Sequence, residues 1–490
     1  MAFRPAPLGP GAVLFRGHEA AFRRYPDLIT VAEIEPQTFW TKGTSAGAAA
    51  RGASPELESI AALPQRKLVH GVGAPLGGTV CDQDRHIDEF RRWSRGLGAA
   101  WTSEHLSLID LSGARGVRSC GFLMPPLQTE PSAELAARNI ARRREVLAAP
   151  LAFETGVNYF PRRSFEMPDG DFFAAVAELS DCGILLDLNN LWVNEKNGRA
   201  LAKDVLKALP LDRVWEVHLA GAVFEQGYWL DAHSGGCAPD LFGLAEDLIP
   251  QLSSLGAVVF EVAPAWYPHF GEAAFLREME RINRLWEIPR PAARTPAPKP
   301  AVVQVRDSSS APAPAAWEQR LARRLLPVAD RPHGEDDPRF DGSDERAFAL
   351  YADLIASFRR GAIIDVLPNT VRFLLLATGE ACLRERLDRF FSTLAPSLHP
   401  SDEALAFRRF LEVEPAPAPG LRDVLTFEAA LIEAASDDRI VRIEVSSAID
   451  GMLAEIAAGR LPTSAPERRT RLEIGLSPRP FVREVAADEV

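Results

Sequence analysis

The residues best suited to chemistry in this sequence are histidines and acids that precede residue 290. Seven of the nine histidines lie there, and four of them (His70, His105, His218 and His233) end or follow short apolar runs. Acids and amides end or follow the other runs, namely Glu33, Glu35, Glu104, Glu154, Asp187, Asn189, Asn190, Asp231 and Glu261. Imidazole and carboxylate ligands suit iron, manganese, zinc or cobalt, so the pattern indicates a metal site without choosing the metal.

Two short motifs place possible ligands on one side of an extended chain. In Asp231-Ala-His233 and Glu216-Val-His218 the two side chains are two residues apart, and residues i and i+2 of a strand point to the same face. Each motif alone is a weak signal, because a single strand-end histidine is more often a hydrogen-bonded structural residue. The prediction of a site therefore depends on several strand ends contributing together.

Other common chemistries lack their motifs in this chain. The five cysteines lie far apart with no C-x-x-C pair (Cys81, Cys120, Cys182, Cys237 and Cys382), so neither a disulfide framework nor a thiolate zinc site is predicted. No G-x-G-x-x-G or G-x-x-x-x-G-K-[ST] loop follows a predicted strand, so a nucleotide-binding function lacks its phosphate cradle.

Alternating apolar and amphipathic segments must position these residues. Short β-branched or aromatic runs predict strands at 11–15, 28–34, 67–72, 99–106, 150–154, 183–188, 213–219 and 257–262. Helical patterns lie between them at 83–97, 132–148, 171–181, 199–208, 240–254 and 272–286. This many β-α units favours an α/β fold of the TIM-like (β/α)8 barrel type, in which the carboxyl ends of the strands meet at one mouth.

A proline-rich stretch divides the chain. Seven prolines lie between Pro289 and Pro314, a composition typical of an extended linker. We therefore predict a barrel domain over 1–288, a linker over 289–316 and a second domain over 317–490. The second domain shows helical spacing at 347–358, 371–375, 382–394, 404–411 and 421–435, followed by a candidate strand at 439–445.

Composition limits the classes of partner. The net charge of -12 comes from 67 acidic and 55 basic residues, which gives no electrostatic footprint for duplex nucleic acid or an anionic membrane. No stretch approaches the ~20 apolar residues of a membrane span, and prolines interrupt the first residues before an apolar signal segment could form. We expect a cytoplasmic protein that binds neither nucleic acid nor membrane.

Six strings of residues, in this order and spacing, resemble the multinuclear non-heme iron-dependent oxidative enzymes, the family of the methanobactin-forming oxidase. They are HGVGAPLGG (70–78), SEHLS (103–107), LLDLNNLWVN (185–194), EVHLAG (216–221), DAH (231–233) and FEV (260–262). The likeness covers residues 10–288. It implies a barrel that holds two or three irons and uses dioxygen to oxidise a residue, often cysteine, of a ribosomally made precursor peptide.

The resemblance also implies which residues act. The implied metal ligands are His70, His105, Glu154, Asn189, His218, Asp231, His233 and Glu261. Asp187 and Glu216 are expected as accessory catalytic groups, with Asp187 sharing a strand face with Asn189. The chain departs from the family at Ala222, where a second histidine is common, and at Thr155 and Gln37, each in place of part of a Glu-Asn pair. We therefore expect two irons rather than three.

The C-terminal region bears a weaker resemblance. YADLIASFRR (351–360), VLPNTVRFLLL (366–376) and FRRFL (407–411) are similar to the small partner proteins that bind the precursor peptide, and a plain helical bundle is the alternative. Fusion to such a domain would raise the effective concentration of substrate at the barrel mouth. For the barrel itself, a Zn- or Mn-dependent hydrolase or sugar isomerase and a non-catalytic binding barrel are the other candidate functions.

Overall fold

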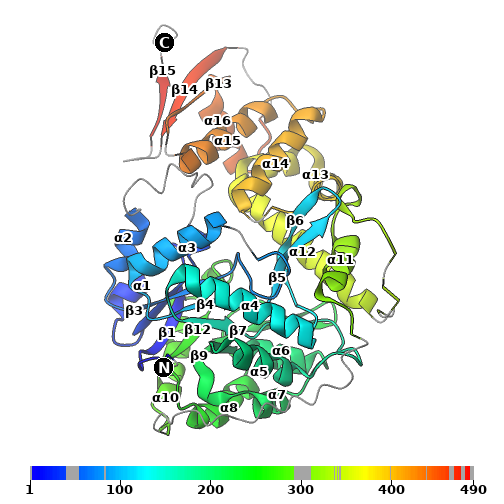
Figure 1. Ribbon diagram of the computed structural model, residues 1–490. Coiled ribbons are helices and arrows are strands. Elements are labelled where there is room, and N and C mark those ends of the chain that lie inside the picture. The colour runs from blue at the N-terminus through cyan, green and yellow to red at the C-terminus, as the bar shows by residue number, and fades with distance from the viewer. Residues whose placement is uncertain are drawn as a thin grey trace.

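The structure, a computed structural model, shows a closed parallel barrel joined to a mostly helical region (Figure 1). It describes residues 3–39, 55–81, 84–291, 311–335, 337–338, 340, 344–397, 399–437, 439–462, 468–475 and 481–485. The predicted TIM-like barrel followed by a helical region is confirmed.

Eight parallel strands close the barrel in the order β1-β12-β9-β8-β7-β4-β3-β2. They are β1 (Gly9–Leu14), β2 (Val31–Ile34), β3 (Arg66–Gly71), β4 (Thr102–His105), β7 (Leu151–Glu154), β8 (Gly183–Asp187), β9 (Val214–Ala220) and β12 (Ala257–Glu261). Each of them overlaps one of the eight predicted runs. Pairing of β1 with both β2 and β12 completes the ring, so every strand end of the barrel faces the same mouth.

The helices that cover the barrel follow the predicted pattern. Six coincide with predicted segments: α3 (Asp84–Leu97), α4 (Glu130–Leu147), α5 (Asp169–Ser180), α7 (Ala202–Ala208), α8 (Pro239–Leu248) and α10 (Glu272–Trp286). Four further helices were not predicted: α1 (Glu19–Arg24), α2 (Pro55–Ala61), α6 (Leu188–Lys196) and α9 (Tyr267–Phe270). These four helices span one to three turns, and so short a segment repeats its apolar spacing too few times to be recognised.

Period-two alternation along the strands builds the barrel interior in two layers. Inward-facing residues near the strand starts form an apolar plug that includes Val31, Leu68, Trp101, Ala152, Leu185 and Val259. The residues two positions further on share that direction and are polar: Glu33, His70, Ser103, Glu154, Asp187 and Glu261. The residues in between, such as Phe153 and Phe260, pack under the outer helices. A dry apolar floor therefore lies beneath a polar layer.

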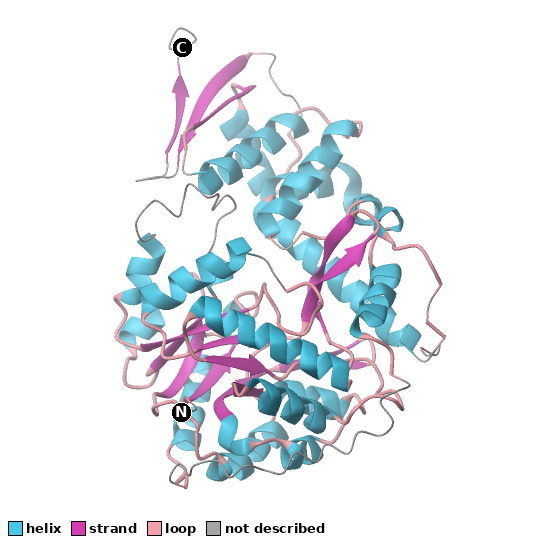
Figure 2. Cartoon of the chain, in the orientation of Figure 1, coloured by secondary structure: helices cyan, strands magenta, loops and turns pink. Residues whose placement is uncertain are grey.

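Two hairpins were not predicted. β5 (Leu108–Gly113) and β6 (Gly116–Met124) follow β4, and β10 (Ala222–Glu225) and β11 (Tyr228–Asp231) follow β9. Each pair is antiparallel and forms a sheet of its own, apart from the barrel. Figure 2 shows β5 and β6 reaching from the barrel toward the helical region.

The helical region spans residues 314–485. It contains α11 (Pro314–Leu325), α12 (Glu345–Val366), α13 (Pro368–Thr393), α14 (Pro400–Val413), α15 (Leu421–Asp437) and α16 (Ile449–Ala457). An antiparallel sheet of β13 (Val441–Ser446), β14 (Arg469–Gly475) and β15 (Phe481–Val485) closes it. The candidate strand at 439–445 is therefore confirmed as β13. Most of the predicted linker, residues 292–310, lies outside the described residues.

Helix α12 belongs to two cores. Its first half packs with α11 into the barrel's core, where Trp317, Phe348 and Tyr351 each place their ring centroid 5.0 Å from that of Phe160. Its last residues, including Ile363, pack in the separate core of α13, α14 and α15. The two regions of the chain therefore share one continuous helix.

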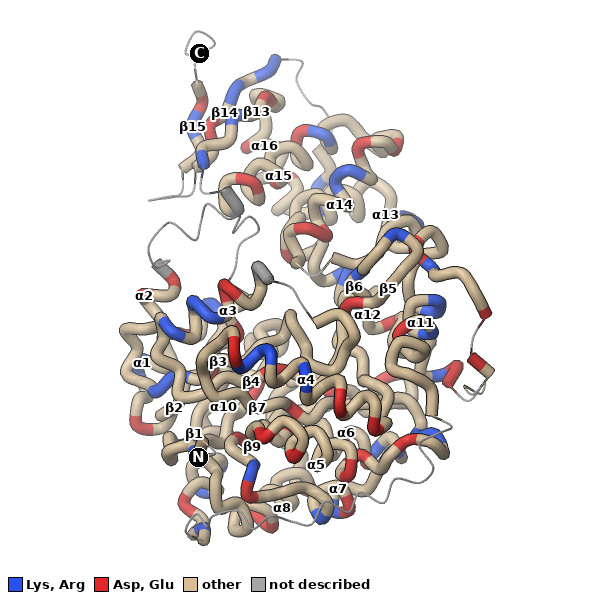
Figure 3. Tube along the Cα trace, viewed as in Figure 1, with Lys and Arg blue, Asp and Glu red and all other residues tan. Residues whose placement is uncertain are grey.

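Charges of both signs are interspersed along the helices and along β14 and β15 (Figure 3). Among the described helices, none taken singly has the length and apolar content of a membrane span. In the described part of the chain, α12 and α13 taken as a pair reach that length and apolar content, but they are bent by 105° relative to each other.

The contact of α11 and α12 with the barrel predicts a stability effect. Phe160 is 1% exposed, so Phe160→Ala should leave a cavity between the two regions and lower the free energy of unfolding by about 3–5 kcal/mol. Denaturant unfolding of the metal-free chain measures this change. Phe224→Ala, at a phenylalanine that is 62% exposed, is the control and should change stability by less than about 0.5 kcal/mol. Equal effects of the two substitutions would contradict the packing.

Candidate metal centre

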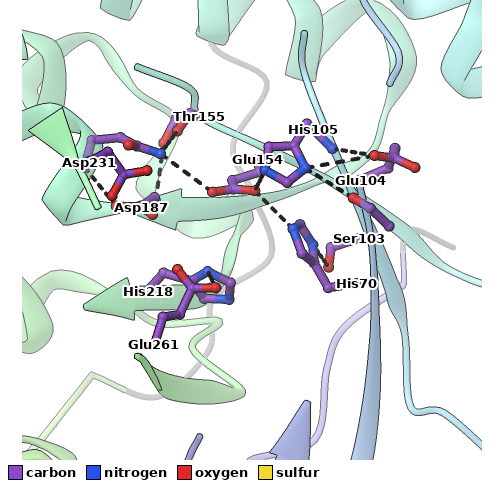
Figure 4. Close-up of polar contacts among 12 residues, drawn as sticks. His70, Ser103, Glu104, His105, Glu154, Thr155, Asp187, His218, Asp231 and Glu261 are labelled. Carbon is purple, nitrogen blue, oxygen red and sulfur yellow. Dashed lines mark hydrogen bonds and ion pairs between the residues drawn. The ribbon is translucent and has the colours of Figure 1, made fainter. Parts of the chain in front are cut away.

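Three neighbouring strand ends bring His70, His105 and Glu154 together. The Nε2 atoms of His70 and His105 lie 3.1 Å and 2.9 Å from the same Oε2 atom of Glu154. The two imidazole centroids are 4.6 Å apart, and Figure 4 shows both rings pointing at this carboxylate. The three ligand atoms are close enough to bind one ion.

The other ring nitrogen of each histidine is already engaged. His70 Nδ1 lies 2.9 Å from Ser103 Oγ, and His105 Nδ1 donates to the carbonyl oxygen of Gly71 at 3.0 Å. Such bonds fix the ring orientation and leave Nε2 as the ligand atom, the usual arrangement around metal-binding histidines. A side chain at Gly71 is excluded, because its Cβ would lie 2.3 Å from Glu104 Oε2.

A second set of ligand atoms adjoins the first. His218 Nδ1 lies 3.2 Å from Glu261 Oε1. Asp187 and His218 group with Glu154, and Asp187 also groups with His233 and Glu261, in each case within 4.8 Å. Glu154 therefore belongs to both the first and the second set. Shared carboxylates of this kind suit a site that holds more than one ion.

Asp231, His233 and Asn189 complete this side of the site. His233 Nε2 lies 3.2 Å from Asp231 Oδ1 and 3.3 Å from Glu261 Oε2, and Asn189 Nδ2 donates to Asp231 Oδ1 at 2.7 Å. The expected extended geometry of the Asp231-Ala-His233 motif is wrong. His233 adopts a left-handed backbone with φ 47°, and this turn, rather than strand alternation, brings its ring back to Asp231.

The expectation that Asp187 and Asn189 share a strand face is also wrong. β8 ends at Asp187 and α6 begins at Leu188, so Asn189 lies in the first helical turn. Asp187 is the N-cap, and its Oδ1 accepts the backbone N–H of Asn190 at 2.7 Å. Aspartate is favoured at this position because its carboxylate satisfies a free helix donor. The Oδ2 atom of Asp187 has no hydrogen-bond partner among the described residues and remains available as a ligand.

The donor set fits metal ions. Ligands about 2.0–2.2 Å from an ion lie about 3 Å from one another, and the His–carboxylate distances here run from 2.9 to 3.3 Å. Within the described residues, Asp187 Oδ2 and Asn189 Oδ1 have no hydrogen-bond partner. Glu154 Oε2, Glu261 Oε2 and both ring nitrogens of His218 face oppositely charged groups as ion pairs but make no hydrogen bond there. Burying a polar atom without a hydrogen bond costs free energy. A bound cation would offset that cost at these atoms.

Strong electrostatic coupling reinforces this fit. Burial would raise the pKa of the Glu154 carboxyl, but His105 and His70 outweigh it and hold that pKa well below its ordinary value. Burial would also raise the pKa of the Glu261 carboxyl, but the nearby His218 and His233 outweigh burial and lower that pKa to about 2. In return, Glu154 raises the pKa of His105 well above its ordinary value despite burial. Protons on the imidazoles thus balance the carboxylates in the metal-free chain.

Glu33 and Glu35 were recognised as strand-end acids but were not among the expected ligands, and Glu216 lies apart from the ligand sets. Glu33 Oε1 lies 3.0 Å from His218 Nε2, and burial followed by the nearby Glu216 raises the pKa of Glu33 to about 8. Glu216 itself, expected to be catalytic, accepts from Trp101 Nε1 at 2.8 Å and lies 3.8 Å from His218. Burial also raises the pKa of Glu35, against the opposing effect of His70. Val31, Glu33 and Glu35 are spaced two residues apart and so share the inward face of the strand. From this spacing both glutamates could have been predicted to lie at the site.

The three positions that depart from the family's usual residues are Thr155, Ala222 and Gln37, and none of the three belongs to the candidate ligand groups of the described residues. Thr155 Oγ1 accepts the backbone N–H of Asp187 at 3.1 Å. Ala222 begins β10, opposite Asp231, and brings no ligand atom. Gln37 lies in a short 3-10 helix, Pro36–Phe39, and its amide has no hydrogen-bond partner among the described residues.

Comparison with known proteins gives the family. A family model described as RiPP precursor modification enzyme MbnB/TglH/ChrH matches residues 20–287. A UPF0276 protein of Anaeromyxobacter sp. (strain Fw109-5) is 30% identical over 264 residues, which cover 53% of this chain and 87% of that relative. A UPF0276 protein of Chromobacterium violaceum is 31% identical over 184 residues, which cover 38% of this chain and 65% of that relative.

This barrel is therefore that of a peptide-modifying enzyme family. The chain belongs to the RiPP precursor modification enzymes of the MbnB/TglH/ChrH family, whose substrates are ribosomally made precursor peptides. The matched range ends at residue 287, before the helical region.

Solved structures resemble the barrel more distantly. Endonuclease IV from Thermus thermophilus covers 56% of this chain and 98% of its own, with a TM-score of 0.37 and 16% identity. A xylose isomerase domain containing protein from Salmonella typhimurium covers 58% of this chain and 99% of its own, with a TM-score of 0.40 and 13% identity. Neither likeness bears on function.

The raised histidine pKa values predict a pH dependence of metal binding. Despite burial, neighbouring carboxylates raise the pKa of His105, His218 and His233 well above 6.5, so the metal-free chain holds protons there at neutral pH. A metal binds only the neutral imidazole, and binding must release those protons. Affinity for Co(II) should therefore rise with pH, by about tenfold per pH unit for each proton released. Titrations between about pH 6.5 and about pH 8 measure this, and a flat profile would contradict the assignment.

Proposed function

We propose that this chain is an iron- and dioxygen-dependent enzyme that oxidises a residue, cysteine being the first candidate, of a ribosomally made precursor peptide. The observation that carries the proposal is the set of adjoining ligand groups that share Glu154, Asp187, His218 and Glu261. Membership in a peptide-modifying family supports the substrate class. Shared carboxylates support more than one ion, and we propose two.

The two ions would share Glu154 and otherwise use different residues. His70, His105 and Glu154 would hold the first ion. Asp187, His218 and Glu261, with Glu154 as the shared ligand, would hold the second, and Asn189, Asp231 and His233 lie at its outer side. Nitrogen and oxygen donors without thiolate suit ferrous iron. Bound iron would supply the redox chemistry that activates dioxygen and accepts electrons from the substrate.

The protein's own groups orient and shield the reaction. The Ser103 hydroxyl and the Gly71 carbonyl fix the rings of His70 and His105. Glu33 and Glu216 fix His218 through its Nε2. The apolar plug below these residues, with Trp101 fully buried at its centre, excludes water from the inner side of the site. A substrate must therefore enter from the barrel mouth.

The helical region is proposed to contribute peptide recognition. We keep the division into a barrel over 1–288, a linker over 289–316 and a helical domain over 317–490 as part of this proposal. The five cysteines are free thiols, in keeping with the reducing cytoplasm, where we place the reaction.

Removing single ligands should abolish the activity. His233→Ala and Glu261→Ala each delete a group that meets Asp187 at the second ion, so iron content should fall and turnover should drop to background. His269→Ala, at an exposed histidine after β12, is the control and should keep both. Iron analysis of anaerobically prepared protein together with peptide turnover measures the effect. Full activity of His233→Ala would count decisively against the assignment.

The requirement for oxygen separates the proposal from its rival. Anaerobically purified protein should contain iron and should consume dioxygen only when its precursor peptide is added, with the product detected by mass spectrometry. A Zn- or Mn-dependent hydrolase or isomerase would turn over without oxygen. Activity that persists fully in the absence of oxygen would overturn the proposal in favour of that class.

A further inference from the structure

Asp231, at the outer side of the proposed second ion, lies on a hairpin that the barrel sheet does not hold. Among the described strands, β10 and β11 pair only with each other, and Asp231 is the last residue of β11. Its position at the metal centre therefore depends on contacts from outside the hairpin. One such contact comes from Tyr159, whose hydroxyl oxygen accepts the backbone N–H of Asp231 at 3.2 Å.

Tyr159 is itself held by the helical region. It lies in the loop after β7, five residues beyond Glu154, and is 6% exposed. Its backbone N–H donates to the hydroxyl oxygen of Tyr351 at 3.3 Å. Tyr351 is fully buried in α12 and stacks on Phe160 with ring centroids 5.0 Å apart. Two consecutive hydrogen bonds thus connect α12 to the backbone of Asp231.

A second contact from α12 reaches the same hairpin. The guanidinium of Arg346 lies 5.6 Å from the ring centroid of Tyr228, which is on β11. The Tyr228 ring in turn meets the Tyr159 ring edge-on, with centroids 6.1 Å apart. From the barrel side, the Asn197 side chain holds Trp229 of β11 through two hydrogen bonds of 2.8 Å and 2.9 Å. The hairpin is therefore fixed between α6 and α12.

We propose that Tyr351 is a positioning residue of the metal centre, acting through Tyr159 to hold Asp231 beside His233 and Asn189. This inference rests on the proposed metal-binding function and extends it. The helical region then completes the barrel's site in addition to any role in binding peptide. Residues that orient ligands in this way typically change metal affinity by about 10- to 100-fold when they are substituted.

The proposal predicts a selective loss. Asp231 contacts His233 and Asn189, and within the described part of the chain no hydrogen bond or ion pair joins it to His70 or His105. Loss of the Tyr351 hydroxyl should therefore weaken the ion on the His233 side by about 10-fold or more. The ion held by His70, His105 and Glu154 should keep its affinity.

The test is anaerobic Co(II) titration of the full chain with Tyr351→Phe, which removes only the hydroxyl. Trp317→Phe is the matched control: it removes the bond from Trp317 Nε1 to the Pro125 carbonyl (3.0 Å) in the same interface and leaves both bonds on the path to Asp231 in place. We expect Tyr351→Phe to weaken one class of site and Trp317→Phe to weaken none. Tyr159→Phe should weaken the same class, and the double variant should lose less than the sum of the two, because the bonds act in series.

Each other outcome has a distinct meaning. Unchanged cobalt affinity in Tyr351→Phe, or an equal loss at both classes of site, overturns the positioning role. An equal loss in Trp317→Phe also overturns it, because general loosening of the interface would then be the cause. Absence of any cobalt binding in the unsubstituted chain would instead overturn the proposed function.

Discussion

Everything in this structure depends on keeping many carboxylates and imidazoles buried in one layer of the barrel. Glu33, Asp187, Glu216 and His218 are fully buried, and buried charges persist only when they are paired, protonated or bound to a cation. Burial acts to lower the pKa values of His105 and His218, but neighbouring carboxylates raise them well above the ordinary value, which favours protons on these imidazoles in the metal-free chain. An ion can replace those protons, and the ligand spacing fits one.

Strand alternation is the device that creates this layer. Six strands of the barrel (β2, β3, β4, β7, β8 and β12) have an apolar residue of the plug near their start and, two positions later, a polar residue at the site. The apolar floor lowers the local dielectric, which strengthens every interaction between the charges above it. The hydrogen bonds of His70 with the Ser103 hydroxyl and of His105 with the Gly71 carbonyl leave Nε2 of each ring facing the candidate metal site.

Local patterns were sufficient to predict the barrel and to single out most of the side chains that meet at the candidate site. The eight strands and candidate ligands such as His70, Glu154 and Glu261 follow from apolar runs that end in polar residues, a signal contained within a few positions. The start of α6 directly after Asp187 was not predicted, because the segment from Leu185 to Val193 is compatible with either strand or helix. The left-handed turn at His233 leaves no sequence signal of its own, since it is imposed by surrounding contacts.

Long-range contacts were beyond the reach of the sequence. Tyr159 and Tyr351 are 192 residues apart, and neither the spacing nor the composition around them indicates that they meet. For the same reason, the sharing of α12 between two cores appears only in three dimensions. The linker composition predicts a C-terminal region that is tethered to the barrel, whereas α11 and the first half of α12 pack into the barrel's core.

The most direct measurement is anomalous diffraction at the iron edge from crystals grown anaerobically with ferrous iron. The account predicts one peak among His70, His105 and Glu154 and a second among Asp187, His218 and Glu261, both inside the barrel mouth. Crystals that show no anomalous peak at these side chains, or a peak only at the protein surface, would contradict it.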